Sequence, residues 1–389
     1  MISLLIYSVY AGTVKNYAVI MCGSKGWSNY RHQADVYAWR TVLINRGFLP
    51  ENIITLSYND VAKQNNNNTI YHTCHGPNLY EPDVINYTGA DANKDNFFKV
   101  LSTIPSGKGG FFKDIVEVLV IYINHGAYDM LSTPNAFDQP IYTDEFGNVV
   151  NELASRVSRV FCIIEACYSG TIAMHTRYAR NVMFITAANA KQSSYSYGYC
   201  ENLGVFTSNE MTYHLLNYLD NIDNDKRYLD DMILYVRHET NLSNVVRSGL
   251  TKRIKLKELF KTINNHGVNN SLGNTTVVNK HRRRNVNTLT NEELLIIYNR
   301  IRRTLIANIE PLNQERLTEI QCRKRISATA LQLFINEYLH EDNIDFLNLV
   351  SDLCKDFSFN DISQTMHDVR AVKVHEHYRA RRRYGRNIH

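Results

Sequence analysis

Residues 160–170 read VFCIIEACYSG, an apolar run that ends in polar and reactive residues, and residues 118–126, VLVIYINHG, have the same form. Uninterrupted apolar runs are typical of strands that are buried on both faces of a parallel sheet. Three further runs of this kind lie at Tyr17–Cys22, Ile53–Leu56 and Val182–Ala188. We therefore expect these segments to form one mostly parallel sheet.

A helical pattern follows the first of these runs. Ala34, Ala38 and Val42 recur at a spacing of four, which predicts a helix. The pattern stops at Gly47, with Pro50 beyond it, and both residue types commonly end helices. Strand, helix and strand in this order predict an α/β domain.

Length and composition limit the class of protein. The chain has 389 residues, of which 44% are hydrophobic and 21% charged, so we expect two or three folded domains and exclude global disorder. No apolar run reaches the roughly 18 residues that cross a bilayer, so no membrane span is expected.

The pattern changes towards the C-terminus. Residues 265–287 are rich in Asn and predict an exposed linker. Thr290-Asn291-Glu292-Glu293 form a capping box, and only helical patterns follow, so residues 288–389 are expected to form an all-α bundle. The α/β domain is then expected to occupy residues 12–264.

The charge is uneven along the chain. Residues 280–389 hold 19 Lys and Arg against 14 Asp and Glu, whereas residues 1–279 hold 24 of each. A modest basic excess favours a face that docks on an acidic partner over a nucleic-acid site. We interpret the terminal Arg379–Tyr384 as a solvated helix end or as a face that docks on the acidic site, and expect no nucleic-acid partner.

The short apolar opening, residues 1–11, is expected to be a signal peptide, with a first β-strand as the alternative. Cys322 and Cys354 are the two cysteines of the helical region and could pair in an oxidising compartment. Five N-x-[ST] sequons also fit a secretory route: Asn67, Asn86, Asn241, Asn269 and Asn274.

Two apolar runs end in residues that can carry out chemistry. The first leads into His125 and Gly126, and the second leads into Cys167. Since sites form at the carboxyl ends of parallel strands, we expect these side chains to lie side by side. A thiol beside an imidazole is a nucleophile with its base. The alternative is a buried structural cysteine and a loop histidine.

One cluster of potential metal ligands carries no metal prediction. His72, Cys74 and His75 lie in an Asn-rich loop without further ligands at the usual spacing. Neither a metal nor another cofactor is expected.

Several segments resemble the legumain family, the asparaginyl endopeptidases among the caspase-like cysteine peptidases. Residues 24–35, SKGWSNYRHQAD, are similar to the S-x-G-W-x-N-Y-R-H-Q-A-D block of that family. The segments that match further family motifs are Tyr87–Asp91, Asn96-Phe97, His125-Gly126, Glu165–Gly170 and His238–Asn241. Residues 346–369 resemble the helical pro-domain of legumain zymogens. The resemblance implies a caspase-like, mostly parallel sheet flanked by helices, followed by a helical pro-domain.

The resemblance also implies roles for single residues. Cys167 would be the nucleophile and His125 the general base, oriented by Asn29. The backbone N–H groups of Gly126 and Cys167 would stabilise an oxyanion. The pocket for the substrate Asn side chain would use Arg31, His32, Glu165, Ser193 and Ser194.

The chemistry of a carboxamide suits such a pocket, since it offers one acceptor oxygen and one donor NH2 group. Arg31 would bind the oxygen and Glu165 would receive the NH2 group, and a site that pairs both ends rejects apolar residues. The alternative is an ordinary ion pair between these two residues.

Two positions depart from the family pattern. Val205 stands where legumains have an acidic residue after Leu-Gly, so strict Asn preference is in doubt; Val there resembles the catalytic subunit of the GPI transamidase. Asn124 stands where legumains usually have Asp.

Together these features predict a cysteine endopeptidase of the legumain type that cleaves peptides after Asn or Asp, with transpeptidation as a side activity. We expect a secreted, lysosomal or vacuolar zymogen that activates itself after its own pro-domain, held by ion pairs, leaves the site. The alternatives are a catalytic subunit like that of the GPI transamidase, a non-catalytic binding protein on the same fold, and a tail that is a permanent structural domain.

Overall fold

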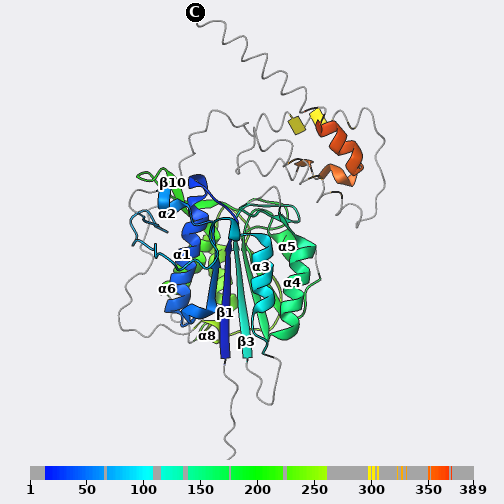
Figure 1. Ribbon diagram of the computed structural model, residues 1–389. Coiled ribbons are helices and arrows are strands. Elements are labelled where there is room, and N and C mark those ends of the chain that lie inside the picture. The colour runs from blue at the N-terminus through cyan, green and yellow to red at the C-terminus, as the bar shows by residue number, and fades with distance from the viewer. Residues whose placement is uncertain are drawn as a thin grey trace, which may run out of the picture.

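The computed structural model describes most of the first 260 residues and part of the tail (Figure 1). The described ranges are 14–64, 68–107, 115–134, 139–174, 177–221 and 226–260, with scattered residues between 297 and 369. The expected signal peptide at 1–11 and the expected linker at 265–287 lie outside the described residues. Their assignments, and the domain boundaries, stay predictions.

A six-stranded sheet forms the centre of the α/β domain (Figure 1). Five of its strands are parallel, and the edge strand β11 runs antiparallel to β8. The expectation of a mostly parallel sheet is therefore confirmed. In spatial order the strands are β11 (Val246–Gly249), β8 (Val182–Thr186), β7 (Arg159–Glu165), β3 (Ile115–Ile123), β1 (Val14–Cys22) and β2 (Ile53–Leu56).

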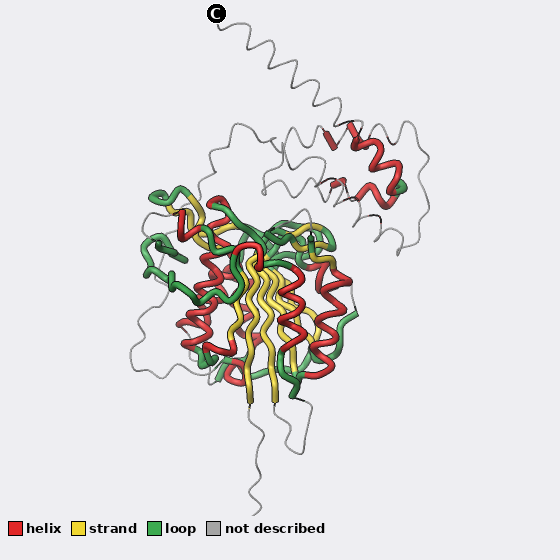
Figure 2. Tube along the Cα trace, in the orientation of Figure 1, coloured by secondary structure: helices red, strands yellow, loops and turns green. Residues whose placement is uncertain are grey.

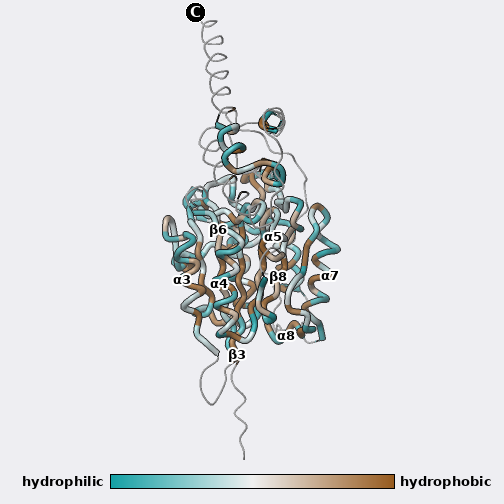
Figure 3. The backbone as a smooth tube through the Cα atoms, turned by 90° about the vertical axis from the view of Figure 1, so that its right-hand side faces the viewer, coloured by the Kyte–Doolittle hydropathy of each residue, from teal (hydrophilic) through white to brown (hydrophobic). Residues whose placement is uncertain are grey.

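Helices cover both faces of this sheet. Side chains alternate between the two faces along each strand, so the apolar strands present an apolar surface on each face, and helices bury it. Leu119 and Ile121 of β3 pack on one face, whereas Val118 and Val120 pack on the other. The first face is covered by α1 (Tyr30–Asn45), α6 (Glu210–Asn221), α7 (Leu229–Glu239) and α8 (Leu256–Leu259). The second face is covered by α3 (Lys94–Thr103), α4 (Thr143–Arg156) and α5 (Gly170–Met174). Figure 3 shows the apolar strands between these helices.

Short elements surround the carboxyl ends of the strands (Figure 2). A three-stranded sheet is formed by β4 (Gly126–Ala127), β5 (Met130–Leu131) and β6 (Ile141–Tyr142), and a separate two-stranded sheet by β9 (Ser196–Cys200) and β10 (Val205–Asn209). The other short helices are η1 (Trp27–Asn29), α2 (Val61–Gln64) and η3 (Gly89–Asp91), together with η2 (Pro50–Asn52), which lies at the amino end of β2.

Helix α1 begins four residues earlier than the apolar spacing suggests. Its first turn consists of Tyr30, Arg31, His32 and Gln33, and all four side chains are buried. Polar residues in a first turn give no apolar period, so the pattern reveals the helix only from Ala34 onwards. The buried polar turn places Arg31 and His32 inside the molecule.

The described residues of the tail include helical segments and a 3₁₀ turn, η5 (Leu353–Lys355). A disulfide joins Cys322 to Cys354, the pair that the sequence suggested. The apolar tail residues form one cluster, which includes Ile301, Ile326, Leu353 and Met366. Across the described residues, no helix is both long and apolar enough to cross a membrane.

Candidate active site

The site lies where β3 and β7 end side by side. These strands pair in register up to Ile123 and Glu165, and the backbone N–H of Asn124 still donates to the Glu165 carbonyl at 3.0 Å. His125 and Cys167 each follow two residues beyond the last pair. A Cβ atom at Gly126 would lie 2.4 Å from the Cys167 carbonyl oxygen, so only glycine allows this approach. The register brings the two strand ends together as expected.

Asn29 fixes the orientation of the His125 ring. The Oδ1 atom of Asn29 lies 3.0 Å from Nε2 of His125, while its Nδ2 donates to the Lys25 carbonyl at 2.9 Å. Because Oδ1 can only accept, Nε2 of His125 carries the proton in this arrangement. The Nδ1 atom is then the ring nitrogen that can act as a base.

Cys167 differs from the other two cysteines outside the disulfides. Its side chain is partly exposed, whereas Cys22 and Cys162 are fully buried. Burial raises the pKa of Cys22 to about 11 and raises that of Cys162 further. The Sγ atom of Cys167 lies 3.6 Å from the Ser194 carbonyl. Of these thiols, Cys167 is the one placed to react.

His32, which is expected to line the pocket for the substrate Asn side chain, packs beside the His125 ring. The two rings meet edge to face with centroids 4.9 Å apart, and the Nδ1 atom of His32 lies 2.8 Å from the Ser24 hydroxyl. Burial, helped by the charges of Arg31 and His125, lowers the pKa of His32 well below its usual value. His32 is therefore neutral and packs against the His125 ring without adding a charge.

Arg31 is held by neutral groups. Its Nε donates to Oδ1 of Asn209 at 3.0 Å and its Nη1 to the Ser28 carbonyl at 3.4 Å. Asn209 in turn donates from Nδ2 to Asp35 at 2.7 Å. The Arg31 side chain thus joins α1 to the end of β10.

Glu165 is not an ion-pair partner of Arg31 among the contacts of the described residues. Its Oε2 accepts the backbone N–H and the hydroxyl of Thr212, each at 2.9 Å, and its Oε1 is buried. Burial, reinforced by the negative charge of Asp35, raises the pKa of Glu165 to about 8. The carboxyl group is therefore protonated in acidic and neutral solution, and Oε1 can present an O–H donor.

The two remaining pocket candidates precede the small hairpin. Ser193 and Ser194 are partly buried and lie just before β9, and the Ser194 carbonyl contacts Cys167. Val205 is buried in the apolar cluster on the α1 face of the sheet and pairs with Cys200 across the hairpin. The position at which the legumain pattern has an acidic residue is thus held by a buried apolar one in this fold.

Asn124 has a contact that an Asp side chain could not make. Its Nδ2 donates to the carbonyls of Gly23 and Ser132, the latter at 2.8 Å. A carboxylate has no donor for either carbonyl. The amide ties the end of β3 to the end of β1, directly before His125.

Comparison with known proteins identifies the family. Residues 16–265 match the Peptidase C13 family. The chain belongs to this family. The hemoglobinase of Schistosoma mansoni is 33% identical over 272 residues, which cover 64% of the present chain and 60% of that protein. The legumain of Mus musculus is 30% identical over 247 residues, 60% of this chain and 56% of that protein.

The chain thus spans about six tenths of the length of these curated relatives. Among solved structures, caspase-1 of Spodoptera frugiperda has a TM-score of 0.40 and 11% identity, with 62% of this chain and 89% of that one covered. The expected resemblance to the legumain family is confirmed.

Some residues of this C13 site were not identified from the sequence. Asn209 contacts Arg31 and Thr212 contacts Glu165, and a disulfide joins Cys74 to Cys200. Asp35 lay within the family block, at i+4 from Arg31, and this spacing is a usable signal for a shared contact. Cys74 and His72 belong to the loop that holds the cluster of potential metal ligands. Cys74 is disulfide-bonded, and His72 contacts Asp35.

Proposed function

We propose that the chain is a cysteine endopeptidase of the legumain type, which cleaves peptide bonds after Asn and, while Glu165 is protonated, after Asp. The observation that carries the proposal is the pairing of β3 and β7 up to their ends. His125 and Cys167 each lie two residues beyond the last pair. Asn29 orients His125, and the thiol of Cys167 is partly exposed. The C13 membership supports the choice of a peptidase over a binding protein.

In the proposed mechanism His125 Nδ1 takes the proton of the Cys167 thiol, and the Sγ thiolate attacks the substrate carbonyl carbon. The N–H groups of Gly126 and Cys167 stabilise the resulting oxyanion. The C–N bond then breaks, and His125 returns the proton to the leaving amine, which leaves a thioester on Cys167. Water attacks this thioester with proton transfer to His125 and yields the acid. A second amine would yield a new peptide bond instead.

The pocket chemistry supports an amide or acid side chain. Arg31 supplies a fixed positive donor. The protonated Glu165 has a hydroxyl for the substrate oxygen and a buried Oε2 held by Thr212. Both groups suit an oxygen acceptor, so the expected role of Glu165 as an acceptor for the NH2 group applies only above its raised pKa. Below that pKa the pocket accepts Asp as well as Asn.

We also propose that the tail caps the site before activation. Ala127 and Met130 of the α/β domain belong to the apolar cluster of the tail, and Cys167 packs at its edge. This apolar contact supports a cap more directly than the ion pairs expected from charge, which stay a prediction. Because the raised pKa of about 8 leaves Glu165 uncharged at neutral pH, this residue is not an anionic docking group for the basic tail.

Two disulfides support a route through an oxidising compartment, and we propose a secreted, lysosomal or vacuolar location. Cleavage within residues 265–287, rich in Asn, would release the cap. The active form would have a mass of about 30 kDa, from the proposed domain split.

The proposal is tested by hydrolysis of a peptide panel with Asn, Asp or Ala before the scissile bond, using wild type and Cys167→Ala at about pH 4–5, where carboxyl groups titrate. We expect wild type to cleave the Asn and Asp peptides and to lose mass by self-cleavage, and Cys167→Ala to do neither. Both chains should leave the Ala peptide intact. Equal processing of the Cys167→Ala chain would rule out self-cleavage, and cleavage of all three peptides would rule out the proposed pocket.

A further inference from the structure

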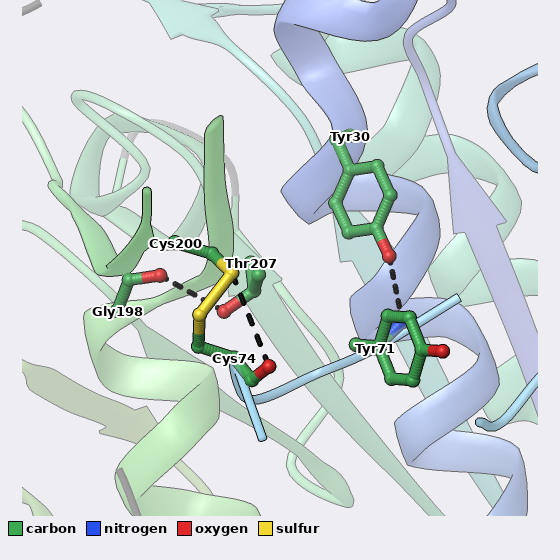
Figure 4. The surroundings of a disulfide bond; sticks show 6 residues. All are labelled: Tyr30, Tyr71, Cys74, Gly198, Cys200 and Thr207. Carbon is green, nitrogen blue, oxygen red and sulfur yellow. Dashed lines mark hydrogen bonds between the residues drawn. A yellow bond between two sulfur atoms is a disulfide. The ribbon is translucent and has the colours of Figure 1, made fainter. Parts of the chain in front are cut away.

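A disulfide joins Cys74 to Cys200, two residues that lie 126 positions apart in the sequence (Figure 4). Neither cysteine takes part in the proposed chemistry. The Cys74 segment nevertheless contacts α1, the helix that carries Arg31 and His32, and Cys200 belongs to the hairpin of β9 and β10.

The Cys200 segment is a hairpin that carries pocket residues at both of its open ends. Ser194, whose carbonyl contacts Cys167, lies just before β9, and Asn209, which holds Arg31, is the last residue of β10. This hairpin is a separate two-stranded sheet, outside the main sheet. An isolated two-stranded sheet is at best marginally stable in water, so its position depends on what holds it.

The Cys74 segment bridges the hairpin and α1. The N–H of Tyr71 donates to the Tyr30 hydroxyl at 2.6 Å (Figure 4). Tyr30 directly precedes Arg31 in the sequence. His72 Nε2 lies 3.0 Å from Asp35 on α1 and 2.8 Å from the Ser208 hydroxyl on β10. The disulfide adds a covalent bond at the turn end of the hairpin, where Cys200 pairs with Val205.

We propose that the Cys74–Cys200 disulfide is a positioning crosslink for the substrate pocket. It holds the β9–β10 hairpin against α1, so that Arg31 and Ser194 keep one fixed separation for the substrate side chain. This inference rests on the proposed peptidase function. A dithiol reductant opens the crosslink: the S–S bond breaks, two thiols form, and the dithiol is oxidised to its cyclic disulfide.

Opening the crosslink loosens the pocket and leaves the His125–Asn29 contact intact, because that contact lies on η1 and the end of β3. Substrate binding therefore weakens more than the chemical step. Pre-organised pocket residues contribute to affinity because less motion is lost when the substrate binds.

The test compares wild type with the double variant Cys74→Ser/Cys200→Ser, without reductant. With an Asn peptide we expect KM to rise on the order of tenfold, because small displacements of positioning groups have effects of this size or larger, and kcat to change much less. The rate of Cys167 alkylation by iodoacetamide should stay the same. The matched control, Cys322→Ser/Cys354→Ser, removes the other disulfide, in the tail, and should leave the hydrogen exchange of residues 196–209 unchanged.

Two further measurements keep the outcome decisive. Hydrogen exchange of residues 196–209 should speed up in the double variant, whichever peptide is cleaved. If that variant does not fold, wild type titrated with dithiothreitol should show KM rising as the Cys74–Cys200 peptide disappears from a non-reduced mass map.

Unchanged KM and unchanged exchange would overturn the crosslink, as would a map in which the linked peptide is absent from the start. A wild-type chain that is alkylated at Cys167 but cleaves no Asn peptide would overturn the proposed function alone, and the exchange measurement would then decide the crosslink.

Discussion

The carboxyl group of Glu165 accepts two hydrogen bonds from Thr212, both at 2.9 Å, while the pKa of that carboxyl is raised to about 8. A buried acid of this kind is stable in its protonated form. Its contribution to stability is fully present below the unfolded pKa of about 4.5 and is lost as the pH rises through the folded pKa of about 8.

The contribution of Glu165 should therefore favour the folded state more in acidic than in alkaline solution. Replacing Glu165 by Gln keeps an acceptor for Thr212 and removes the titration. Between about pH 5 and 9, the free energy of unfolding should fall by a few kcal/mol less in Glu165→Gln than in wild type. Urea unfolding at a series of pH values measures this. A variant with the same pH slope as wild type would show that Glu165 does not titrate in this range.

Asn29 should control the base rather than the fold. In Asn29→Ala the His125 ring loses its orienting acceptor, so kcat should fall by about tenfold to a hundredfold. In Asn29→Asp a carboxylate beside His125 should raise the pKa of the imidazole. The acidic limb of the kcat/KM profile should then move to higher pH. Profiles that coincide for Asn29→Asp and wild type would contradict this role.

Asn209 should act through Arg31. Asn209→Ala leaves the Nε of Arg31 without its acceptor and should raise KM for an Asn peptide by about tenfold, the cost of one hydrogen bond to a charged group. Asn209→Asp replaces the donor to Asp35 by a second carboxylate and should lower stability because two acids then meet. Steady-state kinetics and thermal unfolding separate the two effects. If Asn209→Ala and wild type have the same KM, Asn209 does not position Arg31 for substrate binding.

The apolar contact of the tail predicts how the cap responds to mutation. Phe359 packs against the cluster that contains Ala127 and Met130. Phe359→Ser should weaken docking and speed the reaction of Cys167 with a peptide electrophile in the full-length chain at neutral pH. Leu49→Ser is the control, because Leu49 is 55% exposed on the α/β domain. If Cys167 of Phe359→Ser reacts with the electrophile at the wild-type rate, Phe359 does not contribute to docking of the cap.

The strand ends could be predicted from the sequence because apolar runs mark buried parallel strands, and His125 and Cys167 directly follow two of them. The main sheet was predicted for the same reason. Asn209 could not be found this way, since β10 is a short strand of a mixed polar hairpin without a clear period. The Cys74–Cys200 pair also could not be found, because spacing alone does not tell which of seven cysteines are bonded.

Three glycines at the carboxyl edge of the sheet lie where no side chain fits. A Cβ atom would come within 2.4 Å of Ser132 O at Gly23, 2.4 Å of Cys167 O at Gly126 and 2.6 Å of Ala190 N at Gly170. Of the three, only Gly126 has a proposed part in the reaction, through its backbone N–H, yet each lets two stretches of main chain touch. In a library of all single substitutions these positions should reject even alanine and be as intolerant as Cys167. A ranking of residues by mutational sensitivity alone would therefore outline the scaffold and the reaction centre as one set, and only chemical labelling would separate them.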